Sequence, residues 1–208
     1  RPLACRPGPG TDTWLVTDEQ LALIEQLGMP NRTLVRDVPG HVLQERMHAM
    51  AARGDDWYAS YHTWEEINER LDQLVQAHPS LVHPLVIGTT YEGRSIQGVR
   101  IGTGTEGTKP AVLFNGCQHA REWVSTMVPT FIADELAAGY GIDGRITALL
   151  QLVDVYVVPV VNPDGYIYTY INNGDRFWRK NRRDNGTGCS GVDLNRNWDI
   201  DWNGGEST

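Results

Sequence analysis

Cysteine, positive charge and long apolar runs are all scarce in this sequence of 208 residues. Its three cysteines, Cys5, Cys117 and Cys189, cannot all pair within one chain, and their spacing fits neither a disulfide framework nor a zinc cluster. No apolar run approaches the roughly 20 residues of a membrane span, so we expect no membrane insertion. The 18 lysines and arginines against 26 acidic residues give a net charge of -8, which argues against a nucleic-acid partner.

What remains is the composition of a soluble globular protein, with 40% hydrophobic and 21% charged residues. The length suits one ordinary core, or one domain with a small attachment. The chain opens on Arg1 without an initiator methionine or a visible signal peptide, so we expect that a presequence has been removed.

The strongest chemical signal is the stretch 115–123, which reads NGCQHAREW. It follows an apolar run and precedes a helical pattern, so His119 and Glu122 are expected where a strand turns into a helix. Zinc accepts an imidazole nitrogen and a carboxylate oxygen, and catalytic zinc sites use three protein ligands. We therefore predict that His119 and Glu122 bind zinc together with a third ligand from elsewhere.

The spacing alone is weak evidence, because His62 and Glu65 repeat the same His-x-x-Glu form. We interpret that copy as a helix start, since Thr63 and Glu66 form a capping box ahead of an amphipathic pattern. His119 differs in context: it follows a strand that the pattern predicts to be buried, and an arginine and a tryptophan flank Glu122.

Alternating strand and helix patterns predict an α/β fold with a mixed central sheet flanked by helices. The β-branched run 153–161 is expected to be a central strand buried on both faces. Asn162-Pro-Asp-Gly165 is typical of a type I turn at the end of that strand, where ligands of open α/β sheets collect. The other predicted strands are 85–87, 96–101 and 111–114, and the predicted helices are 63–77, 122–138 and 146–150.

The first 57 residues have a different pattern. Residues 1–12 are rich in proline and glycine and are expected to form a flexible tail. A strand from Trp14, a short helix after Thr17 and a strand over 33–38 would make a small β-α-β piece, with a further helix over 42–52. Residues 53–56 then break the pattern in a stretch that we expect to be exposed and cleavable.

Residues 177–183 form a dense basic cluster in an otherwise acidic protein. Such runs are usually solvated charged faces, and the alternative is a binding role. Further along, another arginine, Arg196, follows an acid, Asp193, and an amide, Asn195. Arginine is suited to clamp a carboxylate with two parallel hydrogen bonds.

Four motifs occur in order along the chain: HAREW at 119–123, NPDG at 162–165, WRKNR at 178–182 and VDLNRNW at 192–198. Together they resemble the motifs of zinc metallocarboxypeptidases of the pancreatic carboxypeptidase A and B type. Residues 58–63 are also similar to the start of the family's mature enzyme, and residues 13–38 with the next helix resemble the end of its inhibitory pro-segment. The resemblance implies a partial pro-segment and connecting helix over 13–57, and the N-terminal half of a catalytic domain over 58–208.

The resemblance also implies roles for the matching residues. His119 and Glu122 would bind zinc, and Asp193 would orient His119 from behind. Arg179 would be catalytic, since it would bind the scissile carbonyl of the substrate and stabilise the oxyanion. The remaining substrate-binding residues would be Arg121, which lines a subsite, and Asn195 and Arg196, which grip the terminal carboxylate.

By the same resemblance, the protein would be secreted as a zymogen and activated by a trypsin-like protease. It would act on the C-termini of peptides or proteins. The family takes its third zinc ligand, a histidine, and its general base, a glutamate, from beyond this region. No histidine follows His119 here, and Glu206 is the only glutamate after Glu135. We therefore expect these 208 residues to be an inactive fragment of such an enzyme.

Two other functions fit the residues. A catalytically silent relative would bind peptide C-termini through Asn195 and Arg196 without cleaving them. A zinc acylase would use the same His-x-x-Glu pair on small N-acyl amino acids, although the WRKNR motif and the likeness to a pro-segment disfavour it. The third ligand and the general base would separate an active enzyme from a silent relative.

Overall fold

The computed structural model describes residues 14–51, 57–171, 173–186 and 190–199. The predictions for the tail 1–12, for the cleavable stretch 53–56 and for Cys189 concern residues outside these ranges. The chain divides into two compact units, Arg1–Glu45 and Arg46–Thr208. None of the helices in the described ranges has the length and apolarity needed to cross a membrane.

The first unit is built around helix α1 (Asp18–Gln26), which begins as predicted. The Thr17 hydroxyl accepts a hydrogen bond from the Gln20 amide, and the Gln20 side chain accepts one from the Thr17 amide, completing the capping box. Helix α2 (Val38–Ala51) begins four residues earlier than predicted, because the Asp37 carboxylate accepts a hydrogen bond from the Gly40 amide and so caps this end.

The β-α-β prediction for this unit was wrong. Residues 33–38 contain bends instead of a strand, and Trp14 forms only an isolated bridge. A strand is stabilised by a neighbour that takes up its backbone hydrogen bonds. The described residues of this unit contain no second strand, so the β-branched pattern over 33–38 has no partner with which to form a ladder.

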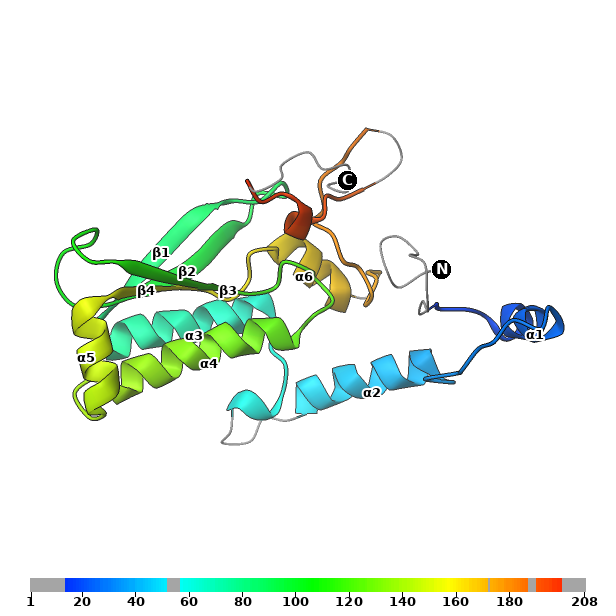
Figure 1. Ribbon diagram of the computed structural model, residues 1–208, viewed down its shortest axis with the longest axis horizontal. Helices are drawn as coiled ribbons and strands as arrows, with labels where there is room; N and C mark the ends of the chain where they lie inside the picture. Colours follow the sequence, from blue (N-terminus) through cyan, green and yellow to red (C-terminus); the bar gives the residue numbers. More distant parts are fainter. Residues whose placement is uncertain (1–13, 52–56, 172, 187–189, 200–208) are drawn as a thin grey trace. The chain divides into compact units, whose positions relative to one another are not determined.

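The second unit contains the predicted mixed sheet, with the strand order β1-β2-β4-β3 (Figure 1). Strands β1 and β2 form an antiparallel hairpin, β2 pairs with β4 antiparallel, and β4 pairs with β3 in parallel. The predicted central strand therefore lies between two neighbours. The strand bounds are Val82–Thr89 for β1, Ser95–Ile101 for β2, Ala111–Asn115 for β3 and Asp154–Val158 for β4.

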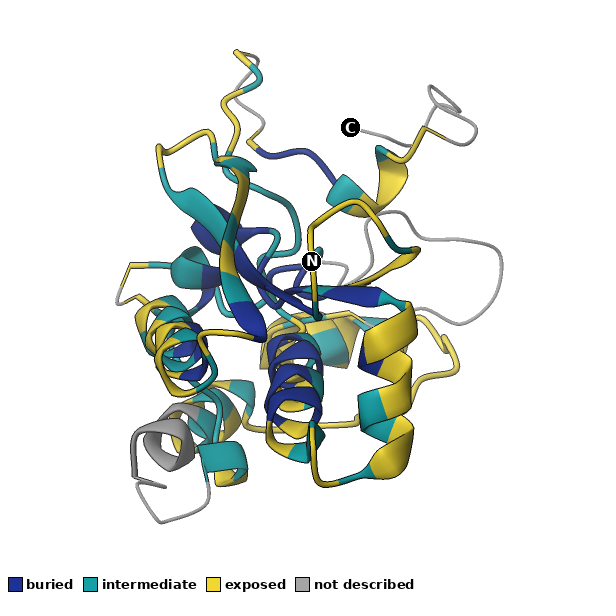
Figure 2. Cartoon of the chain, turned by 90° about the vertical axis from the view of Figure 1, so that its left-hand side faces the viewer, coloured by how far each residue is buried: buried dark blue, intermediate teal, exposed yellow. Residues whose placement is uncertain are grey.

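Helices α3 (Trp64–Ala77), α4 (Val124–Gly139) and α5 (Gly144–Leu152) pack against the sheet. Their apolar positions meet Val155 and Val157 of β4 in the main core, which is the dark blue layer between helices and strands in Figure 2. A second core joins α3 to helix α6 (Pro163–Tyr170). Its buried members are Ile67, Cys117, Trp123, Val160 and Tyr166.

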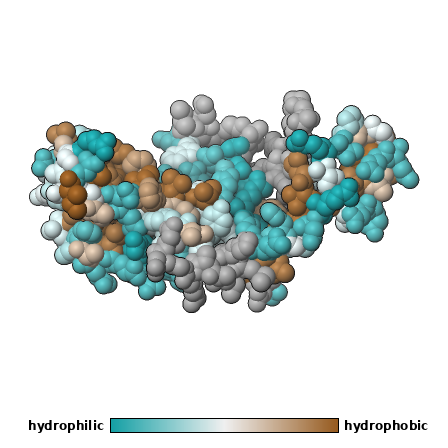
Figure 3. Space-filling view, turned by 90° about the horizontal axis from the view of Figure 1, so that it is seen from below, coloured by the Kyte–Doolittle hydropathy of each residue, from teal (hydrophilic) through white to brown (hydrophobic). Residues whose placement is uncertain are grey.

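Strand β3 departs from the sequence prediction because it is exposed. Leu113 keeps 55% of its surface accessible, and Val112 and Phe114, on the other face of the strand, are exposed as well. Within the described ranges, β3 lies at the edge of the sheet with β4 as its one neighbour, and the described helices leave these three side chains exposed. Apolar side chains are also exposed over α4 and α5, where brown surface gathers in Figure 3. These are Val124, Val128 and Phe131 of α4 and Leu149 and Leu152 of α5.

Candidate metal and substrate site

The candidate site forms where β3 and β4 end, because parallel strands bring their carboxyl ends to the same edge of the sheet. The two following loops are joined directly: the Gly116 amide donates to the Val158 carbonyl, and the Val161 amide donates to the Gly116 carbonyl. Cys117 has a positive φ of 57°, an uncommon conformation that turns the chain out of β3 toward His119.

His119 and Glu122 lie against each other in the loop before α4. The Glu122 amide donates to the His119 carbonyl over 3.1 Å, which folds the loop back on itself. This turn brings His119 Nδ1 to 2.8 Å from Glu122 Oε1. The imidazole is buried, with the residue 9% exposed, while the Glu122 side chain is half exposed. A candidate nitrogen ligand and a candidate oxygen ligand therefore lie next to each other near the protein surface.

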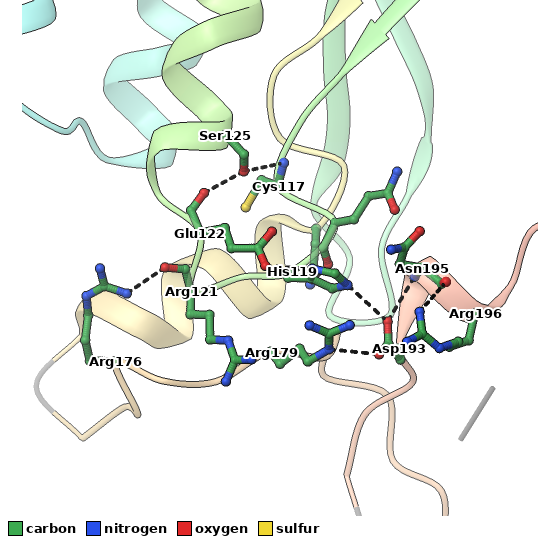
Figure 4. Close-up of polar contacts among 12 residues, drawn as sticks. Cys117, His119, Arg121, Glu122, Ser125, Arg176, Arg179, Asp193, Asn195 and Arg196 are labelled. Carbon is green, nitrogen blue, oxygen red and sulfur yellow. Dashed lines mark hydrogen bonds and ion pairs between the residues drawn. The ribbon is translucent and has the colours of Figure 1, made fainter. Parts of the chain in front are cut away.

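Asp193 lies on the other side of the imidazole, as Figure 4 shows. Its Oδ1 is 3.4 Å from His119 Nε2, and its Oδ2 accepts a hydrogen bond of 2.9 Å from Arg179 Nε. Burial by itself would raise the pKa of the Asp193 carboxyl, but the hydrogen bond and the charge of Arg179 lower that pKa below its usual value. One buried carboxylate thus connects a candidate ligand with the candidate oxyanion arginine.

Asn195 and Arg196 also lie close to Asp193 in the structure. They lie in the 3-10 helix η2 (Leu194–Arg196), whose cap is the Asp193 carboxylate accepting from the Asn195 amide over 3.0 Å. Both residues are exposed, and Arg196 Nη1 donates to the Asn195 carbonyl. The candidate carboxylate-binding pair is therefore anchored to the same acid that faces His119.

Arg121 lies between the two candidate ligands in the loop, and its carbonyl accepts a hydrogen bond from Arg176 Nη1 over 2.8 Å. The Arg176 guanidinium also lies 3.8 Å from the centre of the Trp123 ring. Sequence analysis missed Arg176, which precedes the basic cluster by one position. The sequence carries no local signal for this contact, because Arg176 and Trp123 are far apart along the chain and stack only through tertiary packing.

The basic cluster is not a uniformly solvated face. Arg182 stacks 3.8 Å from the centre of the Tyr168 ring and approaches Trp178 at 4.8 Å, whereas Arg183 is exposed. With Arg179 held by Asp193, two of the arginines have specific partners. The solvated-face interpretation fits Arg183 alone among these three.

The second His-x-x-Glu copy is structural. His62 Nδ1 lies 3.3 Å from Glu66, and its Nε2 lies 2.7 Å from the Trp57 carbonyl. The Thr63 and Glu66 capping box forms as predicted at the start of α3. Both nitrogens of this imidazole are therefore occupied by the protein, which leaves neither available to a metal ion.

The donor set at His119 suits zinc, since imidazole and carboxylate are ligands that zinc accepts. His119 Nε2 is buried and makes no well-directed hydrogen bond, although Asp193 Oδ1 lies 3.4 Å away. The described residues nevertheless contain no group of three or more His, Cys, Asp and Glu side chains placed to hold a metal ion. Two donors fit, and this part of the chain does not complete the set.

Cys117 does not supply a further donor. Burial raises the pKa of its thiol, and the nearby Glu122 carboxylate raises that pKa further. Zinc binds the thiolate, which this environment disfavours. Cys117 is a buried free thiol, and the residue belongs to the second core.

Comparison with known proteins identifies a family for this chain. The model of the zinc carboxypeptidase family matches residues 67–208. The chain belongs to the zinc carboxypeptidase family. Among curated members, Carboxypeptidase A2 of Rattus norvegicus is 38% identical over 187 residues, and Carboxypeptidase A1 of Homo sapiens is 40% identical over 183 residues.

These zinc carboxypeptidases are much longer than this chain. The matches cover 87% of the chain but 44% of the rat protein, and 85% of the chain but 43% of the human protein. The crystal structure of Carboxypeptidase A from Helicoverpa armigera superposes with a TM-score of 0.73 at 31% identity, covering 89% of this chain and 47% of that one. The sequence thus spans less than half the length of these family members.

Proposed function

We propose that this chain provides the first half of the active site of a secreted zinc metallocarboxypeptidase, which removes C-terminal amino acids from peptides. The observation that carries the proposal is the position of Asp193 between His119 and Arg179. Asp193 Oδ1 lies 3.4 Å from His119 Nε2, and Asp193 Oδ2 accepts a hydrogen bond from Arg179 Nε. Membership of the zinc carboxypeptidase family supports the choice of metal and reaction.

Each residue of the proposed site has a distinct task. When bound, zinc would activate water for attack on the scissile carbonyl. Asp193 would fix the tautomer and direction of His119, so that Nδ1 faces the metal beside Glu122. Arg179 would donate hydrogen bonds to the oxygen on which negative charge develops.

Specificity for the chain end would come from the exposed pair in η2. The Arg196 guanidinium and the Asn195 amide would bind the free terminal carboxylate, and Arg121 would line the neighbouring subsite. A carboxylate exists only at the end of a peptide backbone, so this pair would select exopeptidase cleavage. In this proposal the third zinc ligand and the general base come from a part of the protein outside these 208 residues.

The proposal is tested on an extended protein, meaning this chain continued to the length of its relatives. We expect hydrolysis of a peptide with a free C-terminus to be at least about 100-fold faster than hydrolysis of the same peptide with an amidated C-terminus, since the amide forfeits the charge-assisted pair with Arg196. Release of the terminal amino acid is followed by liquid chromatography.

The alternatives give different results in the same assay. A silent relative would bind the free-acid peptide without releasing an amino acid. A zinc acylase would cleave an N-acetylated amino acid while leaving the peptide intact. Either result would refute the peptidase proposal.

A trypsin-like cut after Arg53 is expected to activate the extended protein, because we propose that the residues before it act as a pro-segment that blocks the site. We expect peptidase activity to rise by at least about tenfold after limited trypsin treatment, as substrate gains access to the site. The matched control is Arg53→Gln, which should stay at the uncut level. Equal activity before and after cleavage would contradict the zymogen proposal.

A further inference from the structure

The Asn162-Pro-Asp-Gly165 motif does not form the isolated type I turn that its sequence predicts. Asn162 is the N-cap of helix α6, and Pro163 occupies its first turn. The dihedral angles of a type I turn are close to helical, and proline is favoured at the first helical position, so the same residues can start a helix. Asn162 is only 2% exposed, which is unusual for a cap residue on a helix start.

The Asn162 side chain uses both ends of its amide. Its Oδ1 accepts a hydrogen bond from the Gly165 amide over 3.1 Å, which is the capping interaction. Its Nδ2 donates to the Gln118 carbonyl and to the Lys180 carbonyl, each over 3.1 Å. Gln118 precedes the candidate ligand His119, and Lys180 follows the candidate oxyanion residue Arg179.

Two further features bring these segments together. The Ala120 amide donates to the Arg179 carbonyl over 3.0 Å, which joins the loop after β3 directly to the basic segment. A Cβ atom on Gly165 would lie 2.5 Å from the Lys180 carbonyl oxygen, so the close approach of that segment to α6 depends on glycine.

Asp164 anchors a different part of the fold from the same turn. Its carboxylate is buried and accepts hydrogen bonds from the Thr90 hydroxyl, the Glu92 amide and Arg94 Nη1, all in the turn between β1 and β2. It makes none of the contacts that Asn162 makes with the loop after β3. The two polar residues of the motif therefore hold separate segments.

We propose that Asn162 is a positioning residue, which sets the distance between His119 and Arg179 by holding the carbonyls of their chain neighbours on one amide group. This inference rests on the proposed function, because it assigns Asn162 to that site. An amide is required, since only a group with two N–H donors and an acceptor can hold both carbonyls and cap α6. The hydrogen bonds of the Asn162 side chain are made with Gln118, Lys180 and Gly165, which lie outside the carboxylate-binding pair Asn195 and Arg196.

Asn162→Asp separates the two tasks of the side chain. Aspartate is as good an N-cap as asparagine, so the bond from the Gly165 amide is retained. An ionised carboxylate has no donor and repels the two carbonyl oxygens. Asn162→Ser is the second variant, because a serine hydroxyl caps a helix but is too short to hold both carbonyls. Asp164→Asn is the matched control, a polar change in the same turn.

Amide hydrogen exchange is the first measurement, on both the 208-residue chain and the extended protein. We expect the Ala120 amide to exchange at least about tenfold faster in both Asn162 variants, after normalisation to the amides of β4, because its acceptor Arg179 is no longer held in place. In Asp164→Asn the normalised rate of Ala120 should change by less than about twofold. If the exchange of the Ala120 amide were accelerated equally in the variants and in the control, Asn162 would act only as a helix cap.

The second measurement is the kinetics of the extended protein on a free-acid peptide. We expect kcat of both Asn162 variants to fall about 100-fold, because displaced catalytic groups lose alignment, while KM stays within about threefold, because the carboxylate-binding pair is untouched. Asp164→Asn should change kcat by less than about threefold. A kcat in the Asn162 variants equal to that of Asp164→Asn would overturn the inference. An inactive unmutated protein would instead refute the proposed function, and hydrogen exchange would still decide the role of Asn162.

Discussion

Alanine at Arg179 is expected to lower kcat of the extended protein by about 100- to 1,000-fold, the usual loss when one preorganised oxyanion donor is removed. The guanidinium would interact mainly with charge that develops in the transition state, so KM should change much less than kcat. In the structure, Arg179 is held in place by Asp193 and by its carbonyl bond to Ala120. Initial rates over a range of peptide concentrations give both constants.

Arg183→Ala is the control, because Arg183 belongs to the same basic cluster but is exposed. Its removal should leave kcat within about twofold. The Arg179 variant also leaves the buried Asp193 without its guanidinium partner, so thermal unfolding should be measured alongside. Similar small effects of the two substitutions on kcat would show that the basic cluster 177–183 is a solvated face without a catalytic role.

The 208-residue chain alone is expected to bind zinc weakly and to release no amino acid from a peptide. Catalytic zinc sites use three protein ligands, and the described residues offer the His119 and Glu122 pair without a third. Equilibrium dialysis should give clearly less than one zinc per chain at micromolar metal. One tightly bound zinc per chain, with turnover, would show that the chain contains a complete site.

The same chain is expected to self-associate. In the part of the chain that the structure describes, strand β3 forms an unpaired sheet edge with exposed Val112, Leu113 and Phe114, and its sequence carries no charged residue to discourage pairing. Exposed apolar side chains on α4 and α5 add to this surface. Sedimentation velocity should therefore show oligomers that grow with concentration. A sharp monomer at tens of micromolar would contradict this expectation.

Local patterns predicted most of the second unit, because capping boxes and apolar periodicity act over a few residues. Thr63 starts α3 as expected, and the central strand β4 forms within the β-branched run 153–161, although it ends at Val158. Periodicity says nothing about neighbours in space. It predicted a strand at 33–38 that has no partner, and it did not predict that β3 lies at an exposed edge.

The candidate site was predictable as a set of residues but not as a set of contacts. Motif order brought His119, Asp193 and Arg179 together, yet the hydrogen bond between Asp193 and Arg179 depends on the path of the chain after β4. Asn162 was assigned to a turn because its signature is shared by turns and helix starts. Its burial and its two long-range carbonyl partners arise only from tertiary packing.

Zinc stoichiometry of the extended protein tests the central claim most directly, and the chain offers its own control. Glu122→Gln removes a proposed ligand, whereas Glu65→Gln makes the same change in the second His-x-x-Glu copy, whose histidine is already occupied. The account predicts one tightly bound zinc in the unmutated protein and in Glu65→Gln, and substantially weaker binding in Glu122→Gln. Undiminished zinc affinity in Glu122→Gln would contradict it.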